Sequence, residues 1–178
     1  MKSVRPEWAE SSQLMQDYYD QKWGLPEHDD QELFKMLTLE VFQAGLSWTT
    51  IWKRQENFTQ AFANFDIDKV ASFNEKDYQR LLNDEGIIRN RRKIMATINN
   101  AKVVQKIINS GETFDHYIWS FVDFKPQRLH LNGERLPAKT SESEAMAKNM
   151  KKDGFQFIGP VCAYSFMTGV GLVNAREE

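Results

Sequence analysis

The sequence predicts an all-α protein. Apolar residues recur at helical spacing over most of the chain, and residues that favour helix N-termini precede these runs. No stretch alternates apolar and polar residues with the period of two that is typical of a strand. The 178 residues contain no internal repeat and no low-complexity linker, so we expect a single domain over residues 1–178.

Helix start signals are spread over the first half of the chain. Asp29 and Glu32 form a capping box ahead of an apolar run, and Gly45 can end that helix in a left-handed conformation. The next expected helix begins after Ser47 and continues through Phe62, and two short helices follow it. The N-caps expected here are Asp29, Ser47, Asp66 and Asn74.

The second half follows the same pattern. A longer helix is expected over 90–109, because its apolar residues keep helical spacing and Ser110-Gly111 follows it. Thr113 opens a helix that reaches Phe121, and the segment 123–139 is expected to be irregular. The remaining expected elements are a helix opened by the Ser141/Glu144 capping box and ended by Gly154, and a last helix over 161–170 preceded by Pro160.

Composition excludes several classes of protein. With 41% hydrophobic and 12% aromatic residues the chain can bury a large core, so it is not disordered. No apolar run is long enough to cross a membrane, and the N-terminus lacks the apolar segment of a secretion signal. The single cysteine, Cys162, excludes a disulfide framework within the chain. Because the three histidines are scattered without ligand spacing, no metal site is expected. A reducing cytoplasm fits this cysteine count.

The net charge of -2 conceals a basic segment. Between Glu85 and Lys106 the chain carries six Lys or Arg residues and a single acidic one. At its start a helix is expected to end near Leu82, a turn containing Gly86 follows, and a basic helix begins. The N–H groups of such a turn can bind a phosphate, and the flanking cations attract a DNA backbone. The alternative is an ordinary corner between two helices with a solvated basic face.

Glu40 is the most unusual position in the sequence. Steps of four, three and four residues link Leu33, Leu37, Glu40 and Ala44, which places this carboxylate on the apolar face of its helix. Burial of an unpaired carboxylate is unfavourable, so Glu40 is either paired inside the protein or binds a ligand. Aromatic residues near it in the sequence belong either to the core or to a pocket for a flat, cationic ring. They are Tyr18, Tyr19, Trp23 and Trp48.

Two small polar side chains lie on the last expected helix. Cys162 is expected to be a buried and inert thiol. Ser165 has no histidine near it in the sequence, so a packed residue is favoured over a nucleophile.

Several runs of residues follow one another from about Trp8 to Asn174 in a distinctive order and spacing. The runs are Tyr18-Tyr19-Asp20-Gln21-Lys22-Trp23-Gly24-Leu25-Pro26, Leu39-Glu40-Val41-Phe42-Gln43-Ala44-Gly45-Leu46-Ser47-Trp48, Gly86-Ile87-Ile88-Arg89-Asn90-Arg91-Arg92-Lys93-Ile94, Ile118-Trp119-Ser120-Phe121-Val122, Gly154-Phe155-Gln156-Phe157-Ile158-Gly159, Tyr164-Ser165-Phe166-Met167 and Gly171-Leu172-Val173-Asn174. In order and spacing they resemble the DNA-3-methyladenine glycosylase I family. This resemblance implies the helix-hairpin-helix DNA glycosylase fold, with two helical lobes around a base-binding pocket and the hairpin at about 75–109. It also implies that the N- and C-terminal segments pack together as a second lobe.

The resemblance also implies roles for individual residues. Glu40 would be the catalytic carboxylate that recognises the base, and the Gly45-Leu46 turn would probe the gap that the base leaves in the duplex. The implied walls of the base pocket are Trp8, Tyr18, Trp23, Trp48 and Ser165. The implied DNA-binding residues are Gly45, Leu46, Gly86, Ile88, Arg89, Arg91, Arg92 and Lys93.

The sequence departs from the family at one place. Members commonly join their termini with a zinc ion held by two Cys and two His. Here the corresponding positions read Pro6 and Tyr19, and the tail Ala175-Arg176-Glu177-Glu178 contains neither residue type. All four ligands are therefore absent, and no zinc or other cofactor is expected.

By this resemblance the protein is expected to flip cationic 3-methyladenine out of alkylated double-stranded DNA and release it by hydrolysis, without strand cleavage. The expected enzyme is a monomer of a bacterial-type cytosol, associated with the nucleoid through its DNA, with free 3-methyladenine as product. Two other functions stay open at this point. One is a non-catalytic DNA-binding module, against which the Glu40 pocket argues. The other is an enzyme acting on a free cationic heterocycle, against which the basic hairpin argues.

Overall fold

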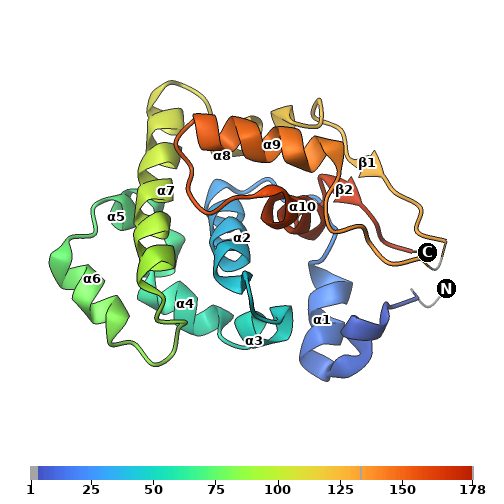
Figure 1. Ribbon diagram of the computed structural model, residues 1–178, viewed down its shortest axis with the longest axis horizontal. Helices are drawn as coiled ribbons and strands as arrows, with labels where there is room; N and C mark the ends of the chain where they lie inside the picture. The colour runs from blue at the N-terminus through green and yellow to red at the C-terminus, as the bar shows by residue number, and fades with distance from the viewer. Residues whose placement is uncertain (1–3, 133, 178) are drawn as a thin grey trace.

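A computed structural model describes residues 4–132 and 134–177 of the chain, so Glu178, the last residue of the tail read for zinc ligands, lies outside it. Most of the described chain is helical, which confirms the predicted all-α class (Figure 1). The elements in chain order are η1 (Glu7–Ser11), α1 (Gln13–Gln21), α2 (Asp30–Gln43), α3 (Trp48–Trp52), α4 (Gln55–Ala61), η2 (Ala63–Phe65), α5 (Ile67–Ala71), α6 (Glu75–Leu82), α7 (Arg91–Asn109), α8 (Phe114–Ser120), β1 (Gln127–Arg128), α9 (Ser141–Lys152), α10 (Pro160–Gly169) and β2 (Val173–Asn174).

The predicted N-caps of the first half are confirmed. Side-chain oxygens of Asp29, Ser47, Asp66 and Asn74 each accept a hydrogen bond from a backbone N–H in the first turn of their helix. Gly45 follows the end of α2 with a φ of 82°, the left-handed conformation expected there.

Three local expectations differ from the structure. The helix expected from Ser47 to Phe62 is interrupted at Lys53 and Arg54, which separate α3 from α4. The capping box of α9 is formed by Thr140 and Ser143, one residue before the predicted pair. Helix α1 was not anticipated, because its short sequence is mostly polar and only Met15, Tyr18 and Tyr19 are buried.

A short parallel pair of strands was also not predicted. Gln127 pairs with Val173 and Arg128 pairs with Asn174, so β1 and β2 are two residues long and show no alternation of side chains. β1 lies inside the segment 123–139 that was expected to be irregular. The pairing attaches this segment to the C-terminal end of the chain.

Helix α2 lies at the centre of the molecule. In Figure 1, α4 to α7 lie on one side of it, and η1, α1 and α10 lie on the other, which gives the two helical lobes implied by the resemblance. α2 is buried from Leu33 to Phe42 except at the half-buried Lys35, and it contacts α3, α7, α8 and α10. A side chain near its C-terminal end is therefore enclosed by both lobes. Among the described residues, no helix has the length and apolar character needed to cross a bilayer.

Candidate base-binding pocket and DNA-binding surface

Glu40 is buried on α2, one turn before the end of that helix. Its exposed fraction is 5%, and its Oε2 atom has no hydrogen-bond partner in the part of the chain that the structure describes. Burial raises the pKa of Glu40 to about 8, because a low-dielectric environment disfavours the charged form. The structural alternative of an internal ion pair is therefore not realised for this carboxyl group among the described residues.

Tyr18 and Gly169 complete the immediate surroundings of this carboxyl group. A Cβ atom placed on Gly169 would lie 3.8 Å from Glu40 Oε1 and 3.8 Å from the Tyr18 hydroxyl, so both oxygens border this glycine of α10. Burial, and then the charge of Glu40, hold the pKa of Tyr18 well above its ordinary value. The Tyr18 hydroxyl therefore stays protonated and can donate a hydrogen bond.

Aromatic rings continue from Tyr18 towards α3. The Tyr18 ring centre lies 4.5 Å from that of Trp52 and 5.7 Å from that of Trp48, and the two indoles stack at 6.0 Å. The indole Nε1 of Trp48 is buried without a hydrogen-bond partner among the described residues. Buried donors and acceptors are normally paired. An unpaired donor and an unpaired acceptor beside the same tyrosine indicate a site for a polar, flat ligand.

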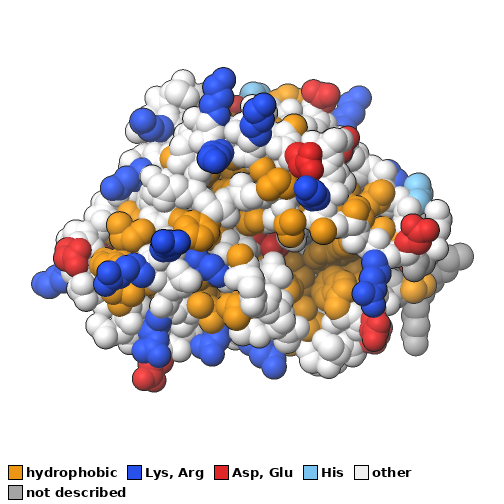
Figure 2. Space-filling model, in the orientation of Figure 1, with side chains coloured by type: hydrophobic (Ala, Val, Ile, Leu, Met, Phe, Trp, Pro, Cys, Tyr) orange, Lys and Arg blue, Asp and Glu red, His pale blue; other side chains and the backbone are white. Residues whose placement is uncertain are grey.

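Trp8 and Trp23 lie on the other side of Tyr18. The Trp8 ring lies 6.1 Å from Tyr18 and 5.6 Å from Trp23, and Trp23 stacks on Tyr19 at 5.4 Å. The structure thus brings together the four aromatic residues predicted to line the pocket, and one of them, Tyr18, borders Glu40. Figure 2 shows this face hollowed between α1 and α10, with hydrophobic side chains lining the hollow.

A cavity of about 730 Å³ adjoins the aromatic cluster. Trp8 and Trp23 line it, whereas Glu40, Tyr18 and Trp48 lie outside its lining. The cavity is thus an outer space that shares these two indoles with the pocket around Glu40. Its lining residues are Val4, Pro6, Glu7, Trp8, Ser11, Tyr19, Trp23, Leu131, Glu134, Arg135, Leu136, Ala175 and Glu177.

Ser165 and Cys162 lie on α10 together with Gly169. Ser165 is half-buried, one helical turn before Gly169, and this spacing places both residues on the same face of the helix. Burial, and then the charge of Glu40, raise the pKa of the Cys162 thiol far above its ordinary value. A thiol that stays protonated is a poor nucleophile, which agrees with the inert role expected for it.

The turn after α2 is the exposed end of this region. Residues 44–47 are exposed, and Leu46 places 38% of its surface in solvent. No atom lies within 4 Å of the position that a Cβ on Gly45 would take. The turn is held by a 2.7 Å hydrogen bond from the Leu46 N–H to the Gln43 carbonyl. An apolar side chain therefore projects from a narrow, ordered turn.

The basic hairpin consists of α6, the turn 83–90 and α7. Arg89, Arg91 and Arg92 are exposed, and Ile88 is half-buried. Basic side chains are spread over this side of the molecule in Figure 2. The first turn of a helix leaves backbone N–H groups without intrahelical acceptors, so the start of α7 suits an anion.

Gly86 differs from the role expected for it. Its N–H donates a 2.8 Å hydrogen bond to the carboxylate of Asp84, so that donor is engaged inside the turn. A Cβ on Gly86 would lie 3.1 Å from the side chain of Asn57. We conclude that Gly86 lets the turn pack closely against α4, and that its N–H is not the phosphate donor.

Lys93 also differs from its expected place at the DNA surface. Only 6% of it is exposed, and its ammonium group donates hydrogen bonds to the carbonyl oxygens of Phe42 and Ala44 at the end of α2. Lys93 therefore points into the protein, whereas Arg89, Arg91 and Arg92 are exposed.

The positions that correspond to the family's zinc site hold a different contact. The Arg176 guanidinium lies over the Tyr19 ring at 4.4 Å from its centre, and donates hydrogen bonds to the carbonyl oxygens of Tyr19 and Trp23 at 2.6 and 2.5 Å. These side chains do not fit a zinc ion, because a guanidinium cannot act as a ligand. Within residues 4–132 and 134–177 no group of three or more His, Cys, Asp or Glu could hold a metal ion.

Three residues of the site were missed by sequence reasoning. Gly169 carried a signal, because a glycine in an apolar helix often marks a close approach. Trp52 lies one turn after Trp48, a spacing that puts both indoles on one face of a helix. Arg176 carried no signal in the sequence, since only the fold places the tail against α1.

The all-helical fold, the basic hairpin and the aromatic pocket around a buried carboxyl group together define a helix-hairpin-helix DNA glycosylase. The family described as methyladenine glycosylase matches residues 8–178, and the chain belongs to that family. DNA-3-methyladenine glycosylase 1 of Escherichia coli strain K12 is 45% identical over 168 residues, which cover 94% of this chain and 90% of the relative. DNA-3-methyladenine glycosylase of Haemophilus influenzae is 40% identical over 173 residues, which cover 97% and 94%.

Solved structures agree with this assignment. A crystal structure of 3-methyladenine DNA glycosylase I superposes with a TM-score of 0.93 at 43% identity, covering 98% of this chain and 96% of the other. A structure that addresses 3-methyladenine recognition by the Staphylococcus aureus enzyme has a TM-score of 0.89 at 35% identity, covering 94% and 90%.

Proposed function

We propose that this protein excises 3-methyladenine from alkylated double-stranded DNA by hydrolysing the bond between the base and its deoxyribose. The observation that carries this proposal is the Glu40 carboxyl group, which is buried with an unpartnered oxygen beside Tyr18, the ring that Trp8, Trp48 and Trp52 pack against. A protein that only bound the DNA backbone would have no use for such a group. The named relatives act on the same lesion.

Recognition follows from charge and shape. Methylation at N3 makes the adenine ring of the nucleotide cationic, and the carboxylate of Glu40 can accept hydrogen bonds from the edge of that ring. The faces of Tyr18, Trp48 and Trp52 offer stacking and cation–π contacts to it. Normal adenine is neutral, so it gains little from a buried carboxylate and does not compensate the cost of ionising Glu40. Trp8, Trp23 and Ser165 would enclose the remaining edges.

Cleavage needs little acid catalysis. When the bond between C1′ and the base breaks, its electron pair neutralises the cationic ring, which departs as neutral 3-methyladenine. The sugar develops positive charge, and a water oxygen bonds to C1′ and loses its proton. In the glycosylase reaction the carboxylate of Glu40 would stabilise the charge that shifts from ring to sugar. Lys93 is engaged at the end of α2, and Lys35, which lies over the Trp52 ring, donates a hydrogen bond to Gln55, so we propose hydrolysis without a covalent lysine intermediate or strand cleavage.

The DNA side of the reaction involves two surfaces. The Gly45-Leu46 turn would enter the duplex where the base has left the stack, because Leu46 is an exposed apolar side chain on an ordered turn. Arg89, Arg91 and Arg92, with Ile88 beneath them, would hold the flanking phosphates at the hairpin. We propose that the chain acts as a single monomeric domain in the cytoplasm, where its DNA substrate lies.

The direct test is incubation of the protein with a methylated duplex. We expect release of free 3-methyladenine, measured by chromatography, and an intact sugar-phosphate backbone until the abasic sites are cleaved by alkali. Unmethylated duplex is the control for specificity. Release of no base, or strand breaks that form without alkali, would contradict the proposed reaction.

A further inference from the structure

Lys93 connects two parts of the proposed DNA-binding surface. It lies in the first turn of α7, directly after the exposed Arg91 and Arg92, yet its side chain turns inward. Its Nζ atom donates hydrogen bonds of 2.9 Å to the carbonyl oxygen of Phe42 and 2.7 Å to that of Ala44. These carbonyls end the helix that carries Glu40 and precede the Gly45-Leu46 turn. Helices α2 and α7 lie side by side in Figure 1.

Both ends of this link are fixed. The Lys93 N–H donates to the side chain of Asn90, and the Thr97 hydroxyl donates to the Lys93 carbonyl, so its backbone is held inside α7. The last carbonyls of a helix have no intrahelical donors and carry the negative end of its dipole. An ammonium group satisfies two of them at once, through hydrogen bonds that are stronger because the donor is charged.

We propose that Lys93 is a positioning residue for base flipping, which locks the Gly45-Leu46 turn to the phosphate-binding hairpin through the end of α2. When the hairpin holds the DNA backbone, this lock sets the depth at which Leu46 enters the duplex. The inference rests on the proposed function. It assigns Lys93 neither to the phosphates nor to the base, although the residue is adjacent in sequence to the arginines that contact DNA.

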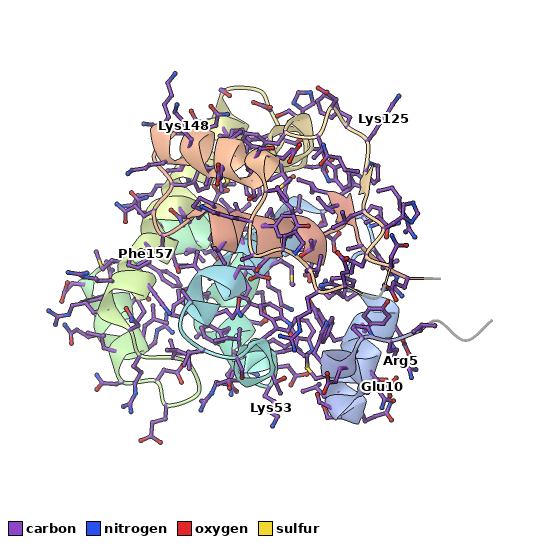
Figure 3. All side chains as sticks on the ribbon, turned by 45° about the vertical axis from the view of Figure 1, so that its right-hand side comes forward. Arg5, Glu10, Lys53, Lys125, Lys148 and Phe157 are labelled. Carbon is purple, nitrogen blue, oxygen red and sulfur yellow. The ribbon has the colours of Figure 1, made fainter. Side chains whose placement is uncertain are left out.

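Phe157 is a second candidate for the coupling to the turn, with weaker support. Phe157, labelled in Figure 3 on the loop before α10, has 46% of its surface exposed and a φ of 64°. Its loop is held against α7 by hydrogen bonds between Asn100 and the backbone of Gln156. Among the described residues, no hydrogen bond or ring contact links Phe157 to the turn or to the pocket, so the coupling is assigned to Lys93.

The test compares Lys93→Met with Lys102→Met, an exposed lysine on the same helix that serves as the matched control. Methionine keeps the unbranched apolar stem, one atom shorter, and removes the donors. We expect faster hydrogen–deuterium exchange at the amides of residues 44–47 in Lys93→Met, with the rest of α2 and α7 still protected. This measurement needs no activity, so it tests the link even if the protein does not excise 3-methyladenine. Loss of protection throughout the molecule would overturn the proposal, because Lys93 would then support the whole fold.

Activity and binding give the second part of the test. Single-turnover excision from duplex DNA should fall by about tenfold or more in Lys93→Met, because misplacement of the probing turn slows flipping. The Kd for free 3-methyladenine and the salt dependence of duplex binding should stay as in the unmodified protein. A salt slope reduced by about one would instead place Lys93 on a phosphate and overturn the proposal. In the double variant that carries both Lys93→Met and Leu46→Ala, the two losses of excision rate should not add, since Lys93 acts through that turn. Additive losses would separate Lys93 from the turn.

Discussion

The guanidinium of Arg176 packs on the ring of Tyr19, 4.4 Å from its centre, and so joins the C-terminal tail to helix α1. The same group bridges the backbone of Tyr19 and Trp23, and Tyr19 stacks on Trp23. At the N-terminal end, Arg5 is paired with Asp20 of α1 through two hydrogen bonds; Figure 3 labels Arg5 beside α1. Arginine contacts thus hold both terminal segments against α1 and support the outer wall of the pocket.

The first prediction concerns this metal-free closure. Arg176→Ala should lower the free energy of unfolding by about 2 kcal/mol, since it removes a cation–π contact and two charge-assisted hydrogen bonds. Arg5→Ala is the matched control, and it should lower the stability much less, because the ion pair that it removes is exposed and screened by solvent. Thermal melts with and without a chelator should coincide for the unmodified protein. A Tm lowered by the chelator would mean that a metal holds the termini.

The second prediction is a stability change with a defined pH dependence. Folded protein keeps a proton on Glu40 up to about pH 8, whereas the unfolded chain loses it near pH 4.5. The folded state therefore loses stability as the pH rises through this window. Glu40→Gln removes the effect, so its free energy of unfolding should exceed that of the unmodified protein by about 1 kcal/mol or more at about pH 8 and by little at about pH 4. Denaturant titrations at both pH values measure this difference, and a constant difference would refute the raised pKa.

The third prediction is the pH profile of excision. A cationic base requires the carboxylate form of Glu40, which the free protein gains as the pH approaches 8. The ratio kcat/KM should therefore rise by about tenfold or more between about pH 6 and about pH 8 and level off above that range. Excision assays on one methylated duplex across this range give the profile. A ratio that falls over the same range would show that protonated Glu40 acts as an acid.

The fourth prediction separates the hairpin from the pocket. Replacing Arg91 and Arg92 with alanine should weaken binding to damaged and undamaged duplex alike, and the slope of log K against log salt should fall by about one per lost phosphate contact. Affinity for free 3-methyladenine should not change, as measured by calorimetry. An unchanged salt slope would move the phosphate site elsewhere on the molecule.

Local chemistry in the sequence accounts for much of the fold. Side chains of Asp29, Ser47, Asp66 and Asn74 cap the helices that they were expected to begin, because capping depends on neighbouring residues only. Two-residue strands cannot produce a periodic pattern, so β1 and β2 depend on the tertiary structure that brings them together.

The site was predictable to the extent that its residues carry local signals. Glu40 was recognisable because a carboxylate on an apolar helix face conflicts with burial, and Tyr18, one of the aromatic residues singled out with it, borders it in space. Lys93 was misplaced because its position next to Arg91 and Arg92 gives no sign of an inward side chain. Its partners, the carbonyl oxygens of Phe42 and Ala44, are about fifty residues away and are brought near only by folding.

The central claim is that Glu40 recognises the methylated base, and side-by-side excision by the unmodified protein and Glu40→Gln tests it most directly. Both proteins should fold and bind duplex DNA with the same salt dependence, since Glu40 touches no phosphate. Only the unmodified protein should release 3-methyladenine from methylated duplex in a single-turnover assay, with the variant slower by about a hundredfold or more. Release by a folded Glu40→Gln at the rate of the unmodified protein would contradict the claim.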